Sequence, residues 1–102
     1  MSKSPIITKK VPLGPARVTP GEILEQEFLI PLAISQSQLA EKIGVDRMRI
    51  SEIIRGARKI TPDTALRFAA FFNTTPKFWL GIQNDHDLAI AAIGKGHDPE
   101  KG

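Results

Sequence analysis

The hydrophobic positions of this chain recur at the three- and four-residue spacing of amphipathic helices. No segment shows the period-two alternation of apolar and polar residues that is typical of a strand. Three Thr-Pro pairs, at 19–20, 61–62 and 75–76, indicate helix starts. A threonine oxygen accepts a hydrogen bond from a free backbone N–H, and proline fits the first helical position. The pattern therefore predicts an all-α fold.

Five helices are expected, joined by short loops. The first covers residues 20–29, with Ile23, Leu24 and Phe28 on its inner face and Pro31 ending it. The second helix is expected over residues 36–43, between Ser35 and Gly44, and the third over residues 47–55, between Asp46 and Gly56. The fourth starts at Pro62 and carries Leu66, Phe68, Ala69 and Phe72. The fifth runs from Pro76 to about Ile93. Together they predict a single domain over residues 19–93.

Both ends of the chain differ in composition from this domain. Residues 1–18 contain Lys3, Lys9, Lys10 and Arg17 and no acidic residue, and they are interpreted as a basic flexible arm. Residues 94–102 are rich in glycine and charge and are expected to form a frayed tail.

Residues 36–55 fit a helix-turn-helix, in which two short helices cross steeply so that the second can enter a major groove. Ala40 supplies the small residue where the helices touch, and Gly44 tolerates the positive φ of the turn. The apolar residues spaced to pin both helices are Leu39, Ile43, Val45, Ile50 and Ile53. An ordinary αα-hairpin is the alternative.

The helical period of 100° per residue separates a buried side of residues 47–55, defined by Ile50, Ile53 and Ile54, from a side that faces DNA. Arginine binds guanine with two hydrogen bonds, glutamate accepts from cytosine, and methionine contacts a thymine methyl. Arg49, at the flank, is assigned to a phosphate. The DNA-contacting residues expected from this segment, the start of the preceding helix and the following loop are Gln36, Ser37, Arg47, Met48, Arg49, Ser51, Glu52, Arg55, Arg58 and Lys59. A solvated basic face is the alternative.

Charge and composition narrow the class of protein. The net charge of +3 and the pI of about 9.5 permit nucleic-acid binding. No cysteine is present, no apolar run reaches the length of a membrane span, and no signal peptide is recognisable, which together favour a cytoplasmic protein. His86 lies between Asp85 and Asp87, but neighbouring helical residues diverge, so no metal or cofactor is expected. No catalytic constellation is recognisable, and an enzyme is not expected.

Four stretches together resemble the HigA-type antitoxins of the XRE group of phage-repressor-like regulators. They are residues 20–24, the helix-turn-helix, residues 60–67, and residues 78–83 followed by Asp87 and Leu88. The resemblance covers residues 17–92. It implies a homodimer that represses its own operon by binding operator DNA, and a HigB-like mRNA-cleaving toxin that the antitoxin neutralises.

Two apolar groups are predicted on the last helix. Phe78, Trp79 and Ile82 are assigned to the core, with a partner surface as the alternative. The second group, at Ala89, Ile90 and Ile93, lies too far along the helix for one compact domain to cover and is the expected dimer interface. Two other functions stay open: a stand-alone transcriptional regulator, and a protein-interaction module on a helix-turn-helix scaffold.

Overall fold

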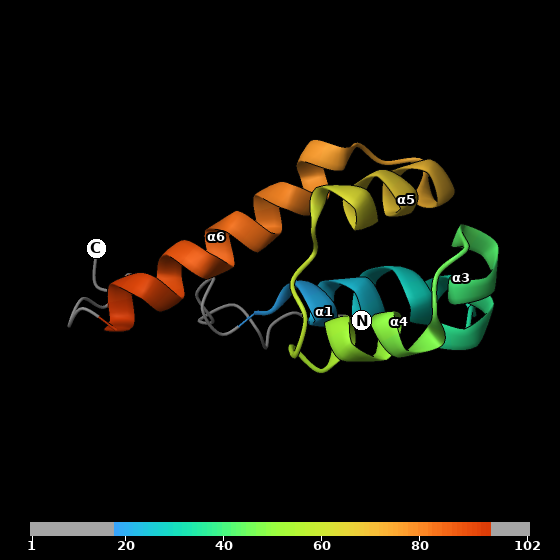
Figure 1. Ribbon diagram of the computed structural model, residues 1–102, viewed down its shortest axis with the longest axis horizontal. Coiled ribbons are helices and arrows are strands. Elements are labelled where there is room, and N and C mark those ends of the chain that lie inside the picture. The colour runs from blue at the N-terminus through green and yellow to red at the C-terminus, as the bar shows by residue number, and fades with distance from the viewer. Residues whose placement is uncertain (1–17, 95–102) are drawn as a thin grey trace, which may run out of the picture.

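The computed structural model describes residues 18–94, and every regular element in this range is helical (Figure 1). The elements are α1 (Pro20–Ile23), the π-helical turn η2 (Leu24–Leu29), α2 (Ile30–Leu32), α3 (Gln36–Ile43), α4 (Arg47–Ile54), α5 (Pro62–Phe72) and α6 (Pro76–Gly94). Because α1, η2 and α2 form one continuous run, the predicted five-helix, all-α fold is confirmed. The expected arm and tail lie outside the described residues, apart from Val18 and Gly94.

The first helical run begins as predicted and ends differently. Thr19 and Glu22 form a capping box: the Thr19 hydroxyl accepts from the Glu22 N–H, and the Glu22 carboxylate accepts from the Thr19 N–H, both at 3.1 Å. The prediction that Pro31 ends this helix is wrong, since the run continues to Leu32 and Ala33 follows at φ 56°. The hydrogen bonds of η2 span five residues rather than four, as from the Ile30 N–H to the Glu25 carbonyl. This wider turn precedes the proline, which lies in the last turn.

The ends of α3 and α4, the two helices of the helix-turn-helix, match the sequence prediction closely. Ser35 and Gln38 form a second capping box at the start of α3, and Gly44 ends α3 at φ 76°. Asp46 has the extended backbone of an N-cap residue, but its side chain makes no capping hydrogen bond. Gly56 follows α4 at φ 80°. The predicted helices therefore exist at the predicted places.

The core is built from one or two large side chains of each helix. Leu24, Leu39, Ile50, Phe68 and Trp79 are all fully buried. The Trp79 ring lies 4.9 Å from those of Phe28 and Phe68, between centroids, and its Nε1–H donates to the Thr74 hydroxyl at 2.7 Å. The assignment to the core is therefore confirmed for Trp79, but it is wrong for Phe78, which is 39% exposed. Buried aromatic pairs of this kind fix the start of α6 against α5.

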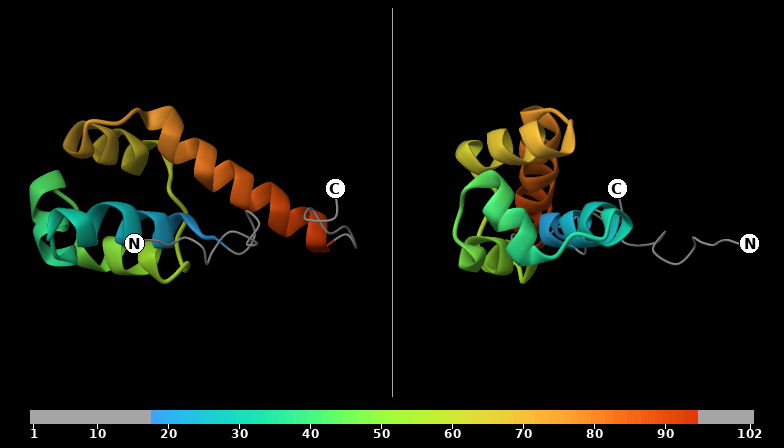
Figure 2. Two further views of the ribbon diagram at one scale, coloured as in Figure 1. Left: turned by 180° about the vertical axis from the view of Figure 1, so that it is seen from behind. Right: turned by 90° about the vertical axis from the view of Figure 1, so that its right-hand side faces the viewer.

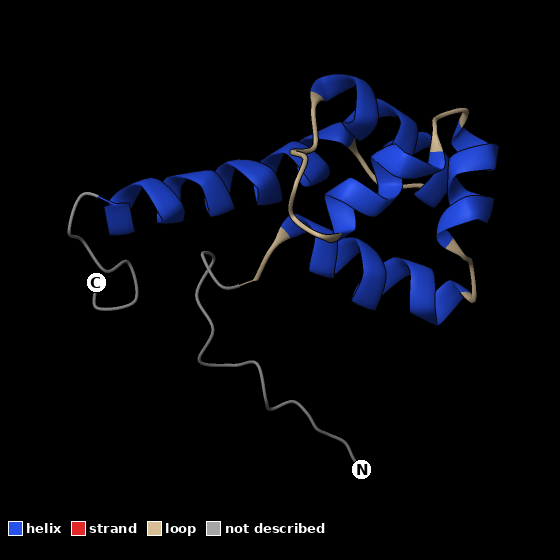
Figure 3. Cartoon of the chain, turned by 60° about the horizontal axis from the view of Figure 1, so that its bottom comes forward, coloured by secondary structure: helices blue, strands red, loops and turns tan. Residues whose placement is uncertain are grey.

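The arrangement of the helices leaves one of them projecting. The α1–η2–α2 run lies beside α4, and α5 packs against the first part of α6 (Figures 1 and 2). The rest of α6 extends past the other helices as a single rod (Figure 3). Leu88, Ile90 and Ile93 on this rod are each at least 50% exposed. The apolar end of α6 is thus largely uncovered by the described residues.

Candidate nucleic-acid interface

The turn between α3 and α4 is closed by backbone hydrogen bonds. The Ala40 carbonyl accepts from the N–H groups of Gly44 and Val45, at 2.9 and 3.0 Å. Ala40 is 3% exposed, so its methyl group leaves no room for a larger side chain without movement. The apolar supports behave as expected, because Leu39, Ile43, Ile50 and Ile53 are buried and Val45 packs against them.

The outward side of α4 carries most of the predicted contacts. Arg47, Met48 and Arg55 are exposed, with Met48 at 55%, while Ser51 and Glu52 are half-buried. Ile50 and Ile53 form the opposite, buried side, as the 100° period predicts. Arg47 is the first residue of α4, at the tip of the helix.

Gln36 and Ser37 are the first two residues of α3. Ser37 is exposed, and the Gln36 Oε1 atom is buried without a hydrogen-bond partner among the described residues. The free N–H groups of a helix start attract phosphate oxygens. The contact of both residues with phosphates stays a prediction.

Arg49 has a partner within the protein, and its contact with a phosphate stays a prediction. Its Nη1–H donates to the Asp63 Oδ2 atom at 3.0 Å, so the flank of α4 is tied to the first turn of α5. The same Oδ2 atom accepts from the Arg67 Nε–H at 3.1 Å. These hydrogen bonds, that from Arg49 first, hold the pKa of Asp63 below its ordinary value of 3.8. The flank position was visible in the sequence; a carboxylate partner fourteen residues away was not.

The basic loop after α4 is also tethered on both sides. The Arg58 Nε–H donates to the Glu52 Oε1 atom at 2.8 Å, and the Lys59 Nζ atom lies 3.3 Å from Asp87 Oδ2. Glu52 is therefore paired with Arg58, where the sequence suggested a cytosine partner. Lys59 remains 72% exposed in its side chain, so it is accessible to a phosphate.

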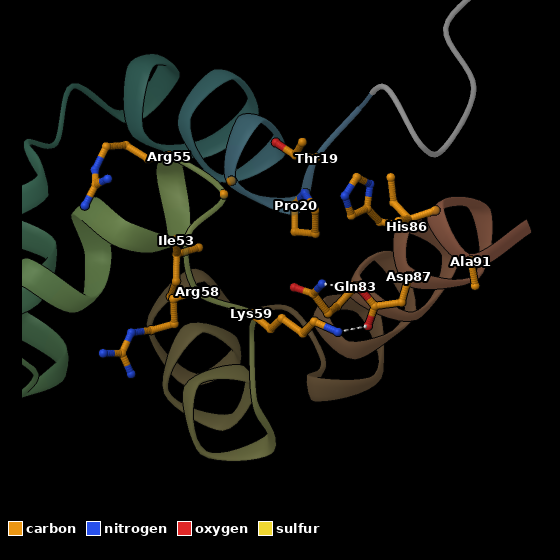
Figure 4. Close-up of a pocket in the computed structure, with 13 residues that line it drawn as sticks. Thr19, Pro20, Ile53, Arg55, Arg58, Lys59, Gln83, His86, Asp87 and Ala91 are labelled. Carbon is orange, nitrogen blue, oxygen red and sulfur yellow. Dashed lines mark hydrogen bonds and ion pairs between the residues drawn. The ribbon is translucent and has the colours of Figure 1, made fainter. Parts of the chain in front are cut away.

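Gln83 is a site residue that the sequence analysis did not identify. It is 8% exposed; its Oε1 atom accepts from the Ile60 N–H at 2.8 Å, and its Nε2–H donates to Asp87 Oδ1 at 2.9 Å. Gln83, Asp87 and Lys59 line a cleft of about 480 Å³, and the ion pair between Lys59 and Asp87 lies within it (Figure 4). The loop that follows α4 is thereby fixed to α6. A lone glutamine on an amphipathic helix gives no sequence signal for such a bond.

At Gly21 the backbone of α1 lies directly against the backbone of α4. A Cβ atom on Gly21 would lie 2.1 Å from the Ile53 carbonyl oxygen and 2.7 Å from the Ile54 Cα atom. Only a glycine lets the start of α1 contact the end of α4 at this distance. The position of α4 therefore depends on a residue that lies far from it in the sequence.

The three expected dimer residues are not equivalent. Ala89 is 5% exposed and offers little surface to a second copy, which corrects its assignment. Ile90 and Ile93, each 50% exposed, remain candidates. Among residues 18–94 no three potential metal ligands lie together, and none of the described helices combines the length and apolarity needed to cross a membrane.

Comparison with known proteins assigns this geometry to a family. The helix-turn-helix family model matches residues 26–79. Antitoxin HigA-1 of Vibrio cholerae is 44% identical over 71 residues, which cover 70% of this chain and 67% of that protein. An addiction module antidote protein of the HigA family from Coxiella burnetii is 43% identical, with a TM-score of 0.75 over 82% of this chain and 89% of that one. The Pseudomonas aeruginosa antitoxin HigA, solved with the higBA promoter, is 37% identical, with a TM-score of 0.74 over 76% of this chain and 85% of that one.

Proposed function

Because this chain belongs to the helix-turn-helix family and is of the HigA antitoxin type, we propose that it is a sequence-specific DNA-binding antitoxin that represses its own operon. One observation carries the proposal: the exposed side of α4 presents Arg47 at its tip, in a fold that matches an antitoxin bound to promoter DNA. Helix α4 is the recognition helix and enters the major groove with its first residues.

The residues on this face divide into two roles. Arg47 and Met48 contact base edges, because an arginine at the helix tip reaches guanine and a methionine suits a thymine methyl. Arg55, Arg58 and Lys59 lie at and beyond the helix end and contact phosphates, which position the protein without reading sequence. The likeness to an antitoxin solved with promoter DNA supports the DNA-binding role over a merely solvated basic face.

The proposed assembly is a homodimer on a two-fold operator. One recognition helix reads only a few base pairs, and a dimer doubles the site with half-sites about 34 Å apart. The uncovered apolar end of α6 at Ile90 and Ile93 is the proposed interface. In the double variant Ile90→Asp with Ile93→Asp, light scattering should show a monomer and circular dichroism should show that it is folded. Its binding to the operator should be weaker than that of the wild type. A dimer that persists would place the interface elsewhere.

The proposed protein partner is a HigB-like, mRNA-cleaving toxin, and the proposed location is the cytoplasm, where the operon and its mRNA are found. The purified protein should abolish RNA cleavage by the toxin encoded beside it. Undiminished cleavage at excess antitoxin, together with operator binding, would instead indicate a stand-alone transcriptional regulator.

Base and phosphate contacts are separable by experiment. Arg47→Ala should relax base preference at one position of each half-site, at a cost of about 1–3 kcal/mol there. Arg58→Ala or Lys59→Ala should weaken binding to all sequences and lower the salt slope by about one per lost phosphate contact. Lys77→Ala is the matched control, because Lys77 is exposed on the first turn of α6, away from α4. A protein that does not distinguish its promoter from unrelated DNA would refute the proposed function.

A further inference from the structure

Asp63 and Arg67 together link both helices of the helix-turn-helix to α5. The Asp63 Oδ2 atom accepts from Arg49, on the flank of α4, and from Arg67, one turn further along α5. Arg67 in turn donates its Nη1–H to the Ile43 carbonyl at 2.7 Å. Ile43 is the last residue of α3, directly before the turn at Gly44. The chain of contacts thus runs from the end of α3, through α5, to the first turn of α4.

From this network we propose that Asp63 is a positioning residue for DNA recognition, which fixes the angle of α4 relative to α3 by holding Arg49 and Arg67 together. The proposal rests on the proposed DNA-binding function. It also changes the role of Arg49 from a phosphate contact to the α4 end of this link. Asp63 determines operator affinity without touching DNA.

The apolar contacts and the Asp63 network hold different sides of α4. Ile50 and Ile53 anchor the buried side of α4 in the core. Arg49 lies on the flank, where a hydrogen bond to α5 opposes rotation of α4 about its buried side. The Arg49 and Asp63 side chains are 31% and 58% exposed, and exposed ion pairs contribute little to folding stability. The network therefore serves orientation more than stability.

The proposal predicts an unusual direction for the change in DNA affinity when the charge of Asp63 is removed. Removing a carboxylate next to a DNA-binding surface ordinarily strengthens binding, because repulsion of the phosphates is relieved. If Asp63 positions α4, its neutralisation weakens operator binding instead. A matched control is Asp46→Asn, since Asp46 lies at the start of the same helix, makes no side-chain capping bond, and is replaced by an equally good N-cap residue.

The experiment measures the affinity of Asp63→Asn, Arg49→Met, the double variant and Asp46→Asn for the operator duplex and a scrambled duplex. Fluorescence anisotropy is used at a temperature where circular dichroism shows every variant folded. Asp63→Asn should bind the operator about three- to tenfold more weakly while its affinity for the scrambled duplex is maintained or increased. The double variant should be no weaker than Arg49→Met, and the salt slope of Arg49→Met should equal that of the wild type. Asp46→Asn should bind both duplexes at least as tightly as the wild type.

Three results would overturn the proposal. Tighter operator binding by Asp63→Asn, with a salt slope lowered by about one in Arg49→Met, would show that Arg49 contacts a phosphate once released. Additive losses in the double variant would show that the two residues act separately. If the wild type binds both duplexes equally, the proposed function fails. The melting temperatures of the same variants, which need no DNA, then decide whether Arg49 and Asp63 are coupled.

Discussion

Replacing Gly21 by alanine tests the contact that seats the recognition helix. Gly21 lies in α1 without a positive φ, so an alanine there is compatible with the backbone. On propensity alone, Gly→Ala within a helix stabilises a protein by about 0.5–1 kcal/mol. The expected outcome is the opposite, because the new methyl group would meet the backbone of α4.

The size of the effect follows from the distances. The added Cβ atom would lie 2.1 Å from the Ile53 carbonyl oxygen, whereas ordinary contact begins at 3.4 Å, so the two helices must separate by the difference of about 1.3 Å. The opposing atoms are backbone and cannot rotate away. Overpacking of this kind costs about 1–3 kcal/mol. A cost of about 3 kcal/mol, less about 1 kcal/mol of helix propensity, leaves about 2 kcal/mol, or a Tm lower by roughly 8–16 °C.

Thermal unfolding followed by circular dichroism measures this directly, and operator titration shows whether α4 has moved. Gly81→Ala is the matched control, since Gly81 lies within α6 and a Cβ atom there has no neighbour within 4 Å. Gly81→Ala should leave Tm unchanged or raise it. If Gly21→Ala also raises Tm and keeps full operator affinity, α1 does not approach α4 as closely as described.

Three further predictions concern other contacts. Ala40→Leu should lower stability by about 1–3 kcal/mol by overpacking the buried turn of the helix-turn-helix, and an unchanged Tm would contradict that packing. Gln83→Leu should cost about 1–3 kcal/mol, because the buried Ile60 N–H loses its acceptor, whereas Asn84→Leu, at an exposed position of the same helix, should have little effect on the same unfolding curve. The Tm of Asp63→Asn should be lower than that of the wild type at neutral pH, and the difference should close as the pH falls below 3.8. The pKa of Asp63 is lowered in the folded protein, so protonation of its carboxylate in acid removes the contribution of that carboxylate to stability. A Tm difference that widens in acid would refute this prediction.

The helix starts were predictable because their causes are local. Thr19 and Ser35 each cap with a partner three residues away, and Gly44 supplies the left-handed backbone that its turn requires. The buried side of α4 also follows from the spacing of Ile50 and Ile53. Each of these features is determined within one helical turn, so the sequence specifies it directly.

The tertiary partners of the site residues were not predictable in this way. Arg49 pairs with a carboxylate fourteen residues away, and Gln83 accepts from a backbone N–H twenty-three residues away. Neither pairing has a periodic or motif signature, and both depend on how the helices cross. The close approach at Gly21 was hidden for the same reason, because its glycine looks in sequence like any small residue near a cap.

The π-helical turn at Leu24–Leu29 affects how the chain tolerates changes in length. Leu24 and Leu29 are both buried although they are five residues apart, a spacing that an α-helix would rotate by about 140° onto different faces. Removing one residue between them would place the two leucines four apart, the spacing at which an ordinary α-helix buries both. A deletion at Gln26 should therefore convert the turn to α-helix and keep the downstream residues in register, whereas a deletion within α4 would rotate its exposed side chains away from their present side.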